Sequence, residues 1–364
     1  MSNVKKVFVA ATKQDQGKTT VSLGLMAAFN DLCGPAGFIK PVGQRYVEIE
    51  ALRVDEDVAL MRAIFPSGGD LRDMSPVTVG RTFTREYIRN PRPQELMTSI
   101  RESFDRMCRT KRSIVIEGTG HAGVGACFDA SNADVARLLG AKVILVTEGG
   151  VGKPIDEVVL NRSLFSECGV ELLGVVLNKV LPDKIDEICS VTGAGLARKG
   201  VDLLGAIPFS QTLENPTMAQ VLDEVGGELL NGKGSLGNIV QEVIIGAMTA
   251  HRALDYMHPG CLLITPGDRD DLILAAVGPL GLDDSDSTVA GLLLTGGISP
   301  QKNILSLVQR TSIPVILTED DSYSAATAVR DLKVKIQPAD TEKTVLARQL
   351  VRRHLDVQGI LDRL

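Results

Sequence analysis

The chain has 364 residues, of which 44% are hydrophobic and 23% charged, and its formal net charge is −6. This length exceeds what one ordinary hydrophobic core needs, so we expect two domains. The acidic balance argues against the broad basic surface of a protein that binds nucleic acid or an anionic membrane. No apolar run reaches the roughly 20 residues of a membrane span and the first residues lack a secretory signal pattern, so we expect no membrane partner.

The cysteines stand apart from one another, and the sequence has no C-x-x-C pair. Such spacing is typical neither of a disulfide framework nor of a zinc site, but of reduced thiols. We therefore expect a cytoplasmic protein. Tryptophan is absent and aromatic residues make up only 4% of the chain, which argues against a surface that stacks nucleic-acid bases.

The strongest motif stands near the start of the chain. The apolar run Val7-Phe8-Val9-Ala10 predicts a buried strand, and a helical pattern follows from Thr20 to Phe29. The residues between them end in Gly17-Lys18-Thr19 and match a phosphate-binding loop, except that Thr12 replaces its first glycine. Lys18 would reach the β- and γ-phosphates, and the Thr19 hydroxyl would hold Mg²⁺. The predicted nucleotide-binding residues of this segment are Thr12, Lys13, Gln14, Asp15, Gln16, Gly17, Lys18, Thr19 and Thr20.

Short Val/Ile/Leu-rich runs alternate with helical patterns along the rest of the chain. This rhythm predicts an α/β fold, with a parallel sheet that has helices on both faces. Loss of periodicity in the glycine-rich segment 226–235 marks a boundary. We therefore expect a P-loop domain over residues 1–227 and a smaller α/β domain over residues 236–364. The expected strands are 4–10, 36–41, 113–117, 142–147, 172–178, 203–207, 239–245, 260–264, 289–294 and 314–317.

Two charged residues stand where expected strands end, the edge at which open α/β sheets bind ligands. Lys40 follows the second strand and would face the phosphates, unless it is a solvated turn residue. Glu117 ends the third strand and would be a carboxylate ligand of Mg²⁺, unless it only caps the turn. Asp55, Glu56 and Asp57 precede the helical run 58–64, where either a capping role or a second Mg²⁺ carboxylate would explain them.

Two further residues end later strands of the first domain. Asn178 ends the fifth strand, and its amide would hydrogen-bond a purine edge. Pro208 follows the sixth strand, where backbone groups would meet the other side of the base. His121, in the loop after Glu117, is an acid–base candidate, but an isolated loop histidine is more often structural.

These motifs, in this order, resemble the dethiobiotin-synthetase-like group of P-loop ATPases, which includes the cobyrinic acid amide synthases. The resemblance covers about residues 4–225 and implies that ATP and Mg²⁺ are the cofactors. It implies catalytic roles for Lys18, Lys40 and Glu117, a metal site of Thr19, Asp57 and Glu117, and adenine recognition by Asn178. The motifs that carry it are Gly17-Lys18-Thr19, Lys40-Pro41-Val42, the acids near Asp57, Glu117-Gly118-Thr119-Gly120 and Asn178-Lys179.

The remainder of the chain resembles a DRTGG domain, through Gly267-Asp268-Arg269-Asp270-Asp271 and Leu294-Thr295-Gly296-Gly297. The pair of modules resembles the N-terminal half of long bacterial phosphate acetyltransferases, without room for their acetyltransferase domain, and a set of stand-alone two-module ATPases. Arg269 would bind an anionic metabolite, or would hold the loops in an Arg–Asp network with Asp268 as a helix N-cap. The acidic run 283–287 is typical of a solvated loop.

Two classes of function follow from these resemblances. One is an ATP-hydrolysing enzyme of the C–N ligase type, which activates a carboxylate or carbamate by phosphorylation. The other is a regulatory ATPase that senses a metabolite. The loop 119–125 departs from the dethiobiotin synthetase substrate loop, so the substrate does not follow from the resemblance. Lys13 resembles the lysine that crosses to a partner's nucleotide in dimeric partitioning-type ATPases, and we expect a homodimer; a solvated lysine is the alternative.

Overall fold

The structure is a computed structural model that describes residues 4–278 and 289–364. The chain forms two compact units, one of Met1–Phe209 together with Ile336–Leu364 and one of Ser210–Lys335. The acidic run 283–287 lies outside the described residues. In the part of the chain that the structure describes, no helix is both long and apolar enough to cross a membrane.

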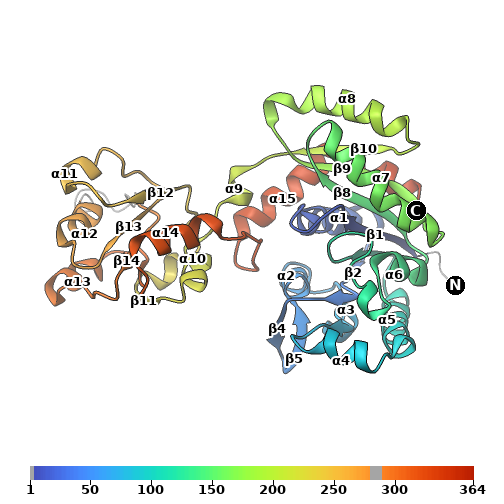
Figure 1. The fold of residues 1–364 in the computed structure, drawn as a ribbon, viewed down its shortest axis with the longest axis horizontal. Helices are drawn as coiled ribbons and strands as arrows, with labels where there is room; N and C mark the ends of the chain where they lie inside the picture. Colours follow the sequence, from blue (N-terminus) through green and yellow to red (C-terminus); the bar gives the residue numbers. More distant parts are fainter. Residues whose placement is uncertain (1–3, 279–288) are drawn as a thin grey trace. The chain divides into compact units, whose positions relative to one another are not determined.

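The first unit is built on a six-stranded sheet in the order β10-β9-β8-β1-β7-β2, whose neighbouring strands all run parallel (Figure 1). Helices cover both faces of this sheet, as the sequence predicts. Residues of β1, β7 and β8 are almost entirely buried, which explains their continuous apolar sequence. The strands are β1 (Lys5–Ala11), β2 (Ala36–Ile39), β7 (Ser113–Glu117), β8 (Lys142–Glu148), β9 (Leu172–Val180) and β10 (Leu203–Pro208).

Helices and short strands fill the connections of the first unit. The helices are α1 (Lys18–Cys33), α2 (Glu56–Ile64), α3 (Leu71–Met74), α4 (Phe83–Arg89), α5 (Pro93–Cys108), α6 (Asn132–Leu139), α7 (Gly152–Glu167), α8 (Ile185–Ala197), α15 (Thr341–His354) and α16 (Val357–Asp362). Two small two-stranded sheets pair β3 (Val42–Gly43) with β6 (Val77–Thr78) and β4 (Tyr46–Ile49) with β5 (Leu52–Asp55). Single-turn 3₁₀ helices lie at η1 (Ala126–Phe128) and η2 (Pro182–Lys184).

The second unit contains a five-stranded sheet in the order β11-β15-β14-β13-β12, in which β11 alone is antiparallel to its neighbour. Successive residues of its central strands enter opposite cores, with Leu263 and Leu292 on one face and Leu262 and Leu293 on the other. The strands are β11 (Glu228–Asn231), β12 (Glu242–Ile245), β13 (Cys261–Pro266), β14 (Gly291–Thr295) and β15 (Val315–Leu317). The helices are α9 (Gln211–Glu214), α10 (Met218–Val225), α11 (Ala250–Ala253), α12 (Asp270–Val277), α13 (Lys302–Val308) and α14 (Ser322–Asp331), with a 3₁₀ turn η3 (Lys233–Ser235).

The C-terminal helix corrects the expected boundaries of 1–227 and 236–364. The sequence places 341–355 in the second domain, whereas α15 packs against α1 in the first unit. The physical reason is Gly24 of α1, where an added Cβ would lie 2.2 Å from the Cβ of Val351. Ala347 and Val351 are fully buried there, so the apolar face of α15 is buried against the helix that follows the phosphate-binding loop.

The other end of the expected boundary also moves. Part of the glycine-rich segment forms β11, which pairs with β15 inside the second unit, and the units divide after Phe209. An added Cβ at Gly227 would lie 2.6 Å from the Leu317 carbonyl oxygen, so this glycine permits the close approach of β11 to β15. The glycines that look like a linker in sequence are therefore part of a sheet edge.

Candidate functional site

Residues 12–17 form a tight loop between β1 and α1, at the carboxyl edge of the six-stranded sheet. Gly17 has φ +83°, and an added Cβ would lie 2.0 Å from Nδ2 of Asn178, so no larger residue fits. Lys18 is the first residue of α1 and is buried. Of the predicted loop residues, Lys13, Gln14 and Asp15 are exposed, Thr12 and Gln16 are buried, and Gly17, Thr19 and Thr20 are partly buried.

A buried cluster of opposite charges lies beside this loop. Lys40 Nζ lies 3.0 Å from Glu117 Oε1 and 3.8 Å from Asp55 Oδ1, and it contacts Asp57 Oδ2 directly. Lys40 is 5% exposed and Glu117 is fully buried. The structure thus brings together the ends of β2 and β7, as the sequence predicts, and adds the start of α2, for which the sequence left two roles open. It also shows that Lys40 is no solvated turn residue.

Burial and the three carboxylates act in opposite directions on Lys40. Desolvation disfavours the ammonium, but Asp57, Glu117 and Asp55 together outweigh it and raise the pKa of Lys40 well above its ordinary value. Lys40 therefore stays charged at any working pH. Its charge is already balanced by protein carboxylates.

Lys18 is in the opposite situation. Burial lowers the pKa of the Lys18 ammonium, and Lys40 lowers it further, although Glu117, Asp57 and Asp15 partly compensate. The backbone N–H groups of the loop are hydrogen-bond donors, so they cannot balance the positive charge of the Lys18 ammonium. An anion seated in the loop would therefore gain more from Lys18 than from Lys40.

The Thr19 hydroxyl points between two carboxylates. Its Oγ1 lies 3.1 Å from Asp57 Oδ1 and 3.2 Å from Glu117 Oε1, although it can donate only one hydrogen bond at a time. Burial raises the pKa of Glu117, against the attraction of Lys40. Glu117 Oε2 is buried without a hydrogen bond among the described residues. An underused buried carboxylate oxygen next to a hydroxyl and a second carboxylate is a donor set that suits Mg²⁺.

The fit to magnesium rests on this mixed set and not on a cage of acids. Among the described residues, no group of three or more His, Cys, Asp or Glu side chains is arranged to hold a metal ion. Magnesium in a phosphate-binding loop is held by one hydroxyl, carboxylates, phosphate oxygens and water, so two carboxylates and Thr19 would suffice. Asp55 caps α2 by accepting from the Asp57 N–H, so it orients Asp57.

Thr12, which replaces the first glycine of the loop pattern, makes side-chain contacts that a glycine could not make. The Thr12 hydroxyl donates to Glu157 Oε2 at 2.9 Å and lies 3.0 Å from the Thr147 hydroxyl. Lys13 Nζ forms an ion pair with Glu157 Oε1 at 2.6 Å. Residues of α7 and β8 thus anchor the start of the loop, and Lys13 contacts its own chain.

Asn178 braces the end of the loop. Its Nδ2 donates to the Gln16 carbonyl at 2.9 Å, and the Gln16 side chain accepts from the Glu148 N–H at 2.7 Å. Asn178 therefore has a structural role in addition to the predicted contact with a base. Pro208 is the last residue of β10. The N–H of the next residue, Phe209, donates to the carbonyl of Val180 at the end of β9.

Two asparagines of this region escaped the sequence analysis. Asn132 of α6 accepts from the Thr119 N–H and donates to the carbonyls of Thr119 and His121, which fixes the loop after Glu117. Asn161 of α7 accepts from the Ala122 N–H at 2.8 Å and donates toward the Thr12 carbonyl at 3.4 Å. Both stand inside helices, where sequence gives no signal of a loop-binding role.

The corresponding edge of the second unit is built differently. Arg269 donates through Nε and Nη2 to Asp271, through Nη1 to the Gly246 carbonyl and through Nη2 to the Met248 carbonyl. The Arg–Asp network therefore forms. Helix α12 begins at Asp270 with Arg269 at its N-cap, so the expected N-cap role of Asp268 is wrong.

Comparisons with known families agree with this two-part organisation. The family model of the AAA domain matches residues 5–217, more than half of the chain, and that of the DRTGG domain matches residues 220–332. A phosphate acetyltransferase of Nitratidesulfovibrio vulgaris is 29% identical over 374 residues, which cover 100% of this chain and 52% of that protein. A phosphate acetyltransferase of Pseudomonas putida is 29% identical over 380 residues, covering 98% and 51%.

The chain thus spans about half the length of the curated relatives it matches. Among solved structures, the CBS and DRTGG region of Clostridium perfringens pyrophosphatase with diadenosine tetraphosphate has a TM-score of 0.27 at 18% identity, over 48% of this chain and 84% of that one. A score this low carries no argument about function. The predicted pair of modules is confirmed. The chain belongs to the AAA-domain family of P-loop proteins and carries a DRTGG domain, as the N-terminal half of long phosphate acetyltransferases does.

Proposed function

We propose that the first unit binds Mg²⁺–ATP and hydrolyses it. The observation that carries this proposal is the position of Thr19 Oγ1, 3.1 Å from Asp57 and 3.2 Å from Glu117, directly after Lys18. Thr19, Asp57 and Glu117 would hold Mg²⁺, which would neutralise phosphate charge as ATP is cleaved. Lys18 would bind the β- and γ-phosphates. Lys40, whose charge the carboxylates already balance, would hold Asp57 and Glu117 in place.

The charges of the site support a strict requirement for the metal. The cluster contains two lysines and three carboxylates, so it has an excess of negative charge when no metal ion is bound. These residues are Lys18, Lys40, Asp55, Asp57 and Glu117. A polyphosphate without Mg²⁺ would be repelled by these carboxylates. ATP affinity should therefore fall steeply when EDTA removes Mg²⁺.

Recognition of adenine is assigned to Asn178 and to backbone groups at Pro208. Asn178 uses one N–H for the Gln16 carbonyl, and its amide has a second N–H and an oxygen that a purine edge would suit. Asn178→Ala should therefore weaken all nucleoside triphosphates through the loop and also relax the preference for ATP. If competition between ATP and GTP is unchanged in this variant, Asn178 does not read the base.

Activation of a carboxylate or carbamate by phosphorylation is one use of such a site. A regulatory ATPase is the alternative, and one observation favours it. The chain leaves the first unit after β10, whose end carries Pro208, and returns to it just before α15, which packs against α1. One connection thus follows the strand that ends at Pro208, and the other precedes a helix that packs against α1, so we expect a small, anionic metabolite held by the DRTGG domain to change ATP turnover. Because Arg269 is engaged with protein groups, that ligand would use other residues.

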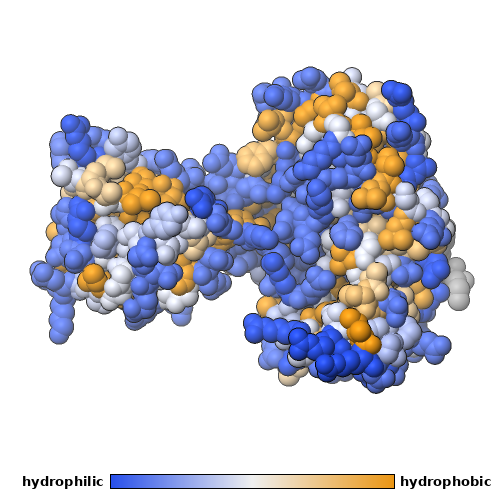
Figure 2. All heavy atoms as spheres, in the orientation of Figure 1, coloured by the Kyte–Doolittle hydropathy of each residue, from blue (hydrophilic) through white to orange (hydrophobic). Residues whose placement is uncertain are grey.

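A homodimer with Lys13 reaching the partner's nucleotide belongs to the same proposal. Exposed apolar side chains gather over α7 and α8 (Figure 2), and α7 also carries Glu157, the ion-pair partner of Lys13. The exposed apolar residues of this region are Val151, Val159, Leu160, Leu181 and Val191. Light scattering after size-exclusion chromatography, with and without Mg²⁺–ATP, tests it; a monomer under both conditions contradicts it.

Lys18→Ala is the experiment that tests nucleotide binding. Affinity for Mg²⁺–ATP, measured by calorimetry, should fall at least about 100-fold because a charge-assisted contact to phosphate is lost. The matched control is Lys142→Ala. Lys142 is the first residue of β8, at the amino end of the strand and away from the phosphate-binding loop, and it pairs with Glu171. Unchanged affinity in a folded Lys18→Ala protein would exclude the phosphate-binding loop.

Glu117→Gln tests the metal site. The amide keeps the shape of the side chain but removes the anionic ligand, so ATP turnover should fall and require more Mg²⁺. Nucleotide should still bind through the loop. Turnover that is unaltered across a Mg²⁺ titration would leave Glu117 a structural residue only.

A screen of carboxylates and amines separates the two uses of ATP. A ligase predicts ADP release that rises with one carboxylate–amine pair. A regulatory ATPase predicts slow turnover that a metabolite changes without being consumed.

A further inference from the structure

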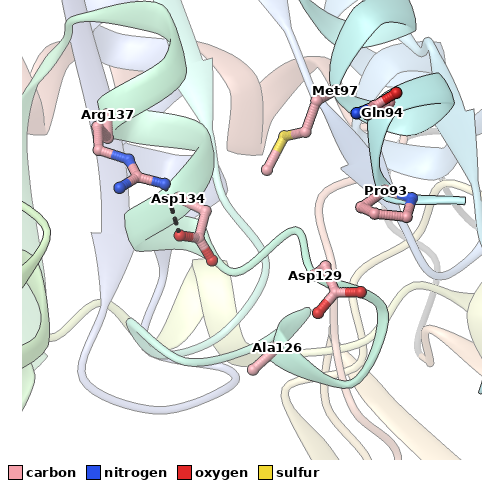
Figure 3. Close-up of a pocket in the computed structure, with 7 residues that line it drawn as sticks. All are labelled: Pro93, Gln94, Met97, Ala126, Asp129, Asp134 and Arg137. Carbon is pink, nitrogen blue, oxygen red and sulfur yellow. Dashed lines mark hydrogen bonds and ion pairs between the residues drawn. The ribbon is translucent and has the colours of Figure 1, made fainter. Parts of the chain in front are cut away.

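A second concave site lies in the first unit, on elements that the phosphate-binding loop does not use. It is a pocket of about 410 Å³ between the start of α5, the turn after η1 and one face of α6 (Figure 3). Small-molecule pockets in proteins span roughly 300–1,000 Å³, so this volume suits a small metabolite. The lining residues are Pro93, Gln94, Met97, Ala126, Asp129, Asp134 and Arg137.

The wall that carries Asp129 is rigidly built. Gly125 has φ +100°, and its carbonyl accepts from the N–H groups of Phe128 and Ala130. The ring of Phe128, 1% exposed, packs edge-on against Phe83 and Tyr87. The Tyr87 hydroxyl donates to Asp129 Oδ2 at 3.0 Å. The Asp129 carboxylate is therefore oriented before any ligand arrives.

The charged groups of the pocket differ in how fully they are used. Asp134 caps α6 with Ser131 and accepts from Arg137 Nη2 at 3.4 Å, the dashed contact in Figure 3. Among the described residues, Asp129 Oδ1 has no hydrogen-bond donor, and the other N–H groups of Arg137 have no acceptor. One carboxylate oxygen and one guanidinium edge thus remain available on opposite sides of the pocket (Figure 3).

Apolar side chains and the Asp134 carboxylate line the surface between these two charges. The Met97 side chain extends into the space between Asp134 and Asp129 (Figure 3), and Pro93 and Ala126 complete this part of the lining. A flexible thioether accommodates aliphatic chains of different shape. The pocket therefore presents the Asp129 carboxylate, an apolar stretch and the Arg137–Asp134 pair in sequence.

We propose that this pocket binds a small zwitterion, with an ammonium group at Asp129, a short aliphatic chain over Met97 and a carboxylate at Arg137. Ligands of this class are amino acids and ω-amino acids. Binding here does not depend on the nucleotide site. The two sites share one loop, because the segment that begins at Gly118 starts next to Glu117 and contains Asp129.

The probes are ω-amino acids of increasing length, from glycine to 6-aminohexanoate, titrated by calorimetry into the full chain without nucleotide. We expect binding with a preferred length. The amine without a carboxylate, hexylamine, and the acid without an amine, hexanoate, should each bind at least about ten-fold more weakly than 6-aminohexanoate, because each lacks one charge-assisted contact. Equal binding of the three, or no binding of any probe at millimolar concentration, overturns the proposal.

Two variants locate the binding. Asp129→Asn removes the charge but keeps an acceptor for Tyr87, and asparagine tolerates the backbone here, where Asp129 has φ +57°. This variant and Arg137→Gln should each lose at least about ten-fold in affinity for the preferred probe. The control Asp105→Asn, an exposed acid on α5 outside the pocket, should bind as the wild type does.

Lys18→Ala separates this proposal from the function proposed above. It should lower ATP affinity at least about 100-fold and leave the zwitterion affinity unchanged, so either site can fail alone. Full zwitterion affinity in both Asp129→Asn and Arg137→Gln would show that the probe binds elsewhere and would overturn the assignment.

Discussion

The two sheets of this protein place polar loops at the same topological position and fill it with different arrangements of charge. At the carboxyl edge of the first sheet, Lys18 and Lys40 stand among three acids. At the carboxyl edge of the second, Arg269 is the basic residue of the loops after β13 and β15. Six acids accompany it there: Asp268, Asp270, Asp271, Glu319, Asp320 and Asp321.

The difference lies in which basic groups are already neutralised. Lys40 and Arg269 are both structural, because carboxylates and carbonyls of the protein surround them. Lys18 differs, since burial lowers its pKa and no ion pair with it occurs among the described residues. The carboxyl edge is where open α/β sheets generally bind ligands. Of these three groups, Lys18 at the first edge is the one whose charge is left for a phosphate.

Removing Lys40 should break this comparison most severely. Lys40→Met leaves Asp57 and Glu117 buried together without their cation, and breaking a buried ion pair in this way costs about 3–5 kcal/mol. Urea unfolding should show this loss in the free energy of unfolding. Lys13→Ala removes a lysine that is 54% exposed and should cost less than about 1 kcal/mol.

Magnesium gives the Lys40 variant a second readout. With the carboxylates unneutralised, Mg²⁺ should raise the unfolding temperature of Lys40→Met more than that of the wild type. A variant as stable as the wild type would mean that the carboxylates are protonated and that Lys40 is not what holds them.

The cluster around Lys40 also shows how far sequence reaches. Strand ends could be predicted because buried parallel strands have continuous apolar sequence, and this placed Lys40, Glu117 and Asn178 at one edge. Asp57 was predicted with two roles open. The structure brings its carboxylate to Thr19 and Lys40, which only the fold of β4, β5 and α2 could reveal.

Contacts between distant segments could not be predicted. The sequence of α15 shows an apolar face but not its partner, and that partner is identified by a missing side chain, Gly24. Asn132 and Asn161 likewise bind loops that are far away in sequence. Side chains of this kind stabilise a site without any local motif.

The second edge is tested by Arg269→Ala. The variant frees Asp271 and two backbone carbonyls, and we expect a loss of about 1–2 kcal/mol, because these hydrogen bonds are charge-assisted but the side chain is 31% exposed. Thermal unfolding should measure this loss of stability. Amide hydrogen exchange should show faster exchange in residues 246–248 and 267–271 of the variant. A stable Arg269→Ala protein that no longer responds to anionic metabolites in a thermal-shift screen would instead assign Arg269 to a ligand.

Replacing Lys18 should have the smallest effect on stability and the opposite sign. Because the pKa of Lys18 is lowered in the folded protein, folding is penalised wherever the unfolded chain carries the protonated amine, that is, below its ordinary value of 10.5. Lys18→Met removes this penalty, so without nucleotide at pH 7 it should raise the unfolding temperature slightly. The advantage should shrink as the pH approaches 10.5, where the wild-type amine loses its proton in both states.

Calorimetric scans of both proteins between pH 7 and about 10 measure this change in relative stability. If Lys18→Met is less stable than the wild type at pH 7, Lys18 neutralises the carboxylates as Lys40 does, and the distinction between a structural and a free lysine at this edge is lost.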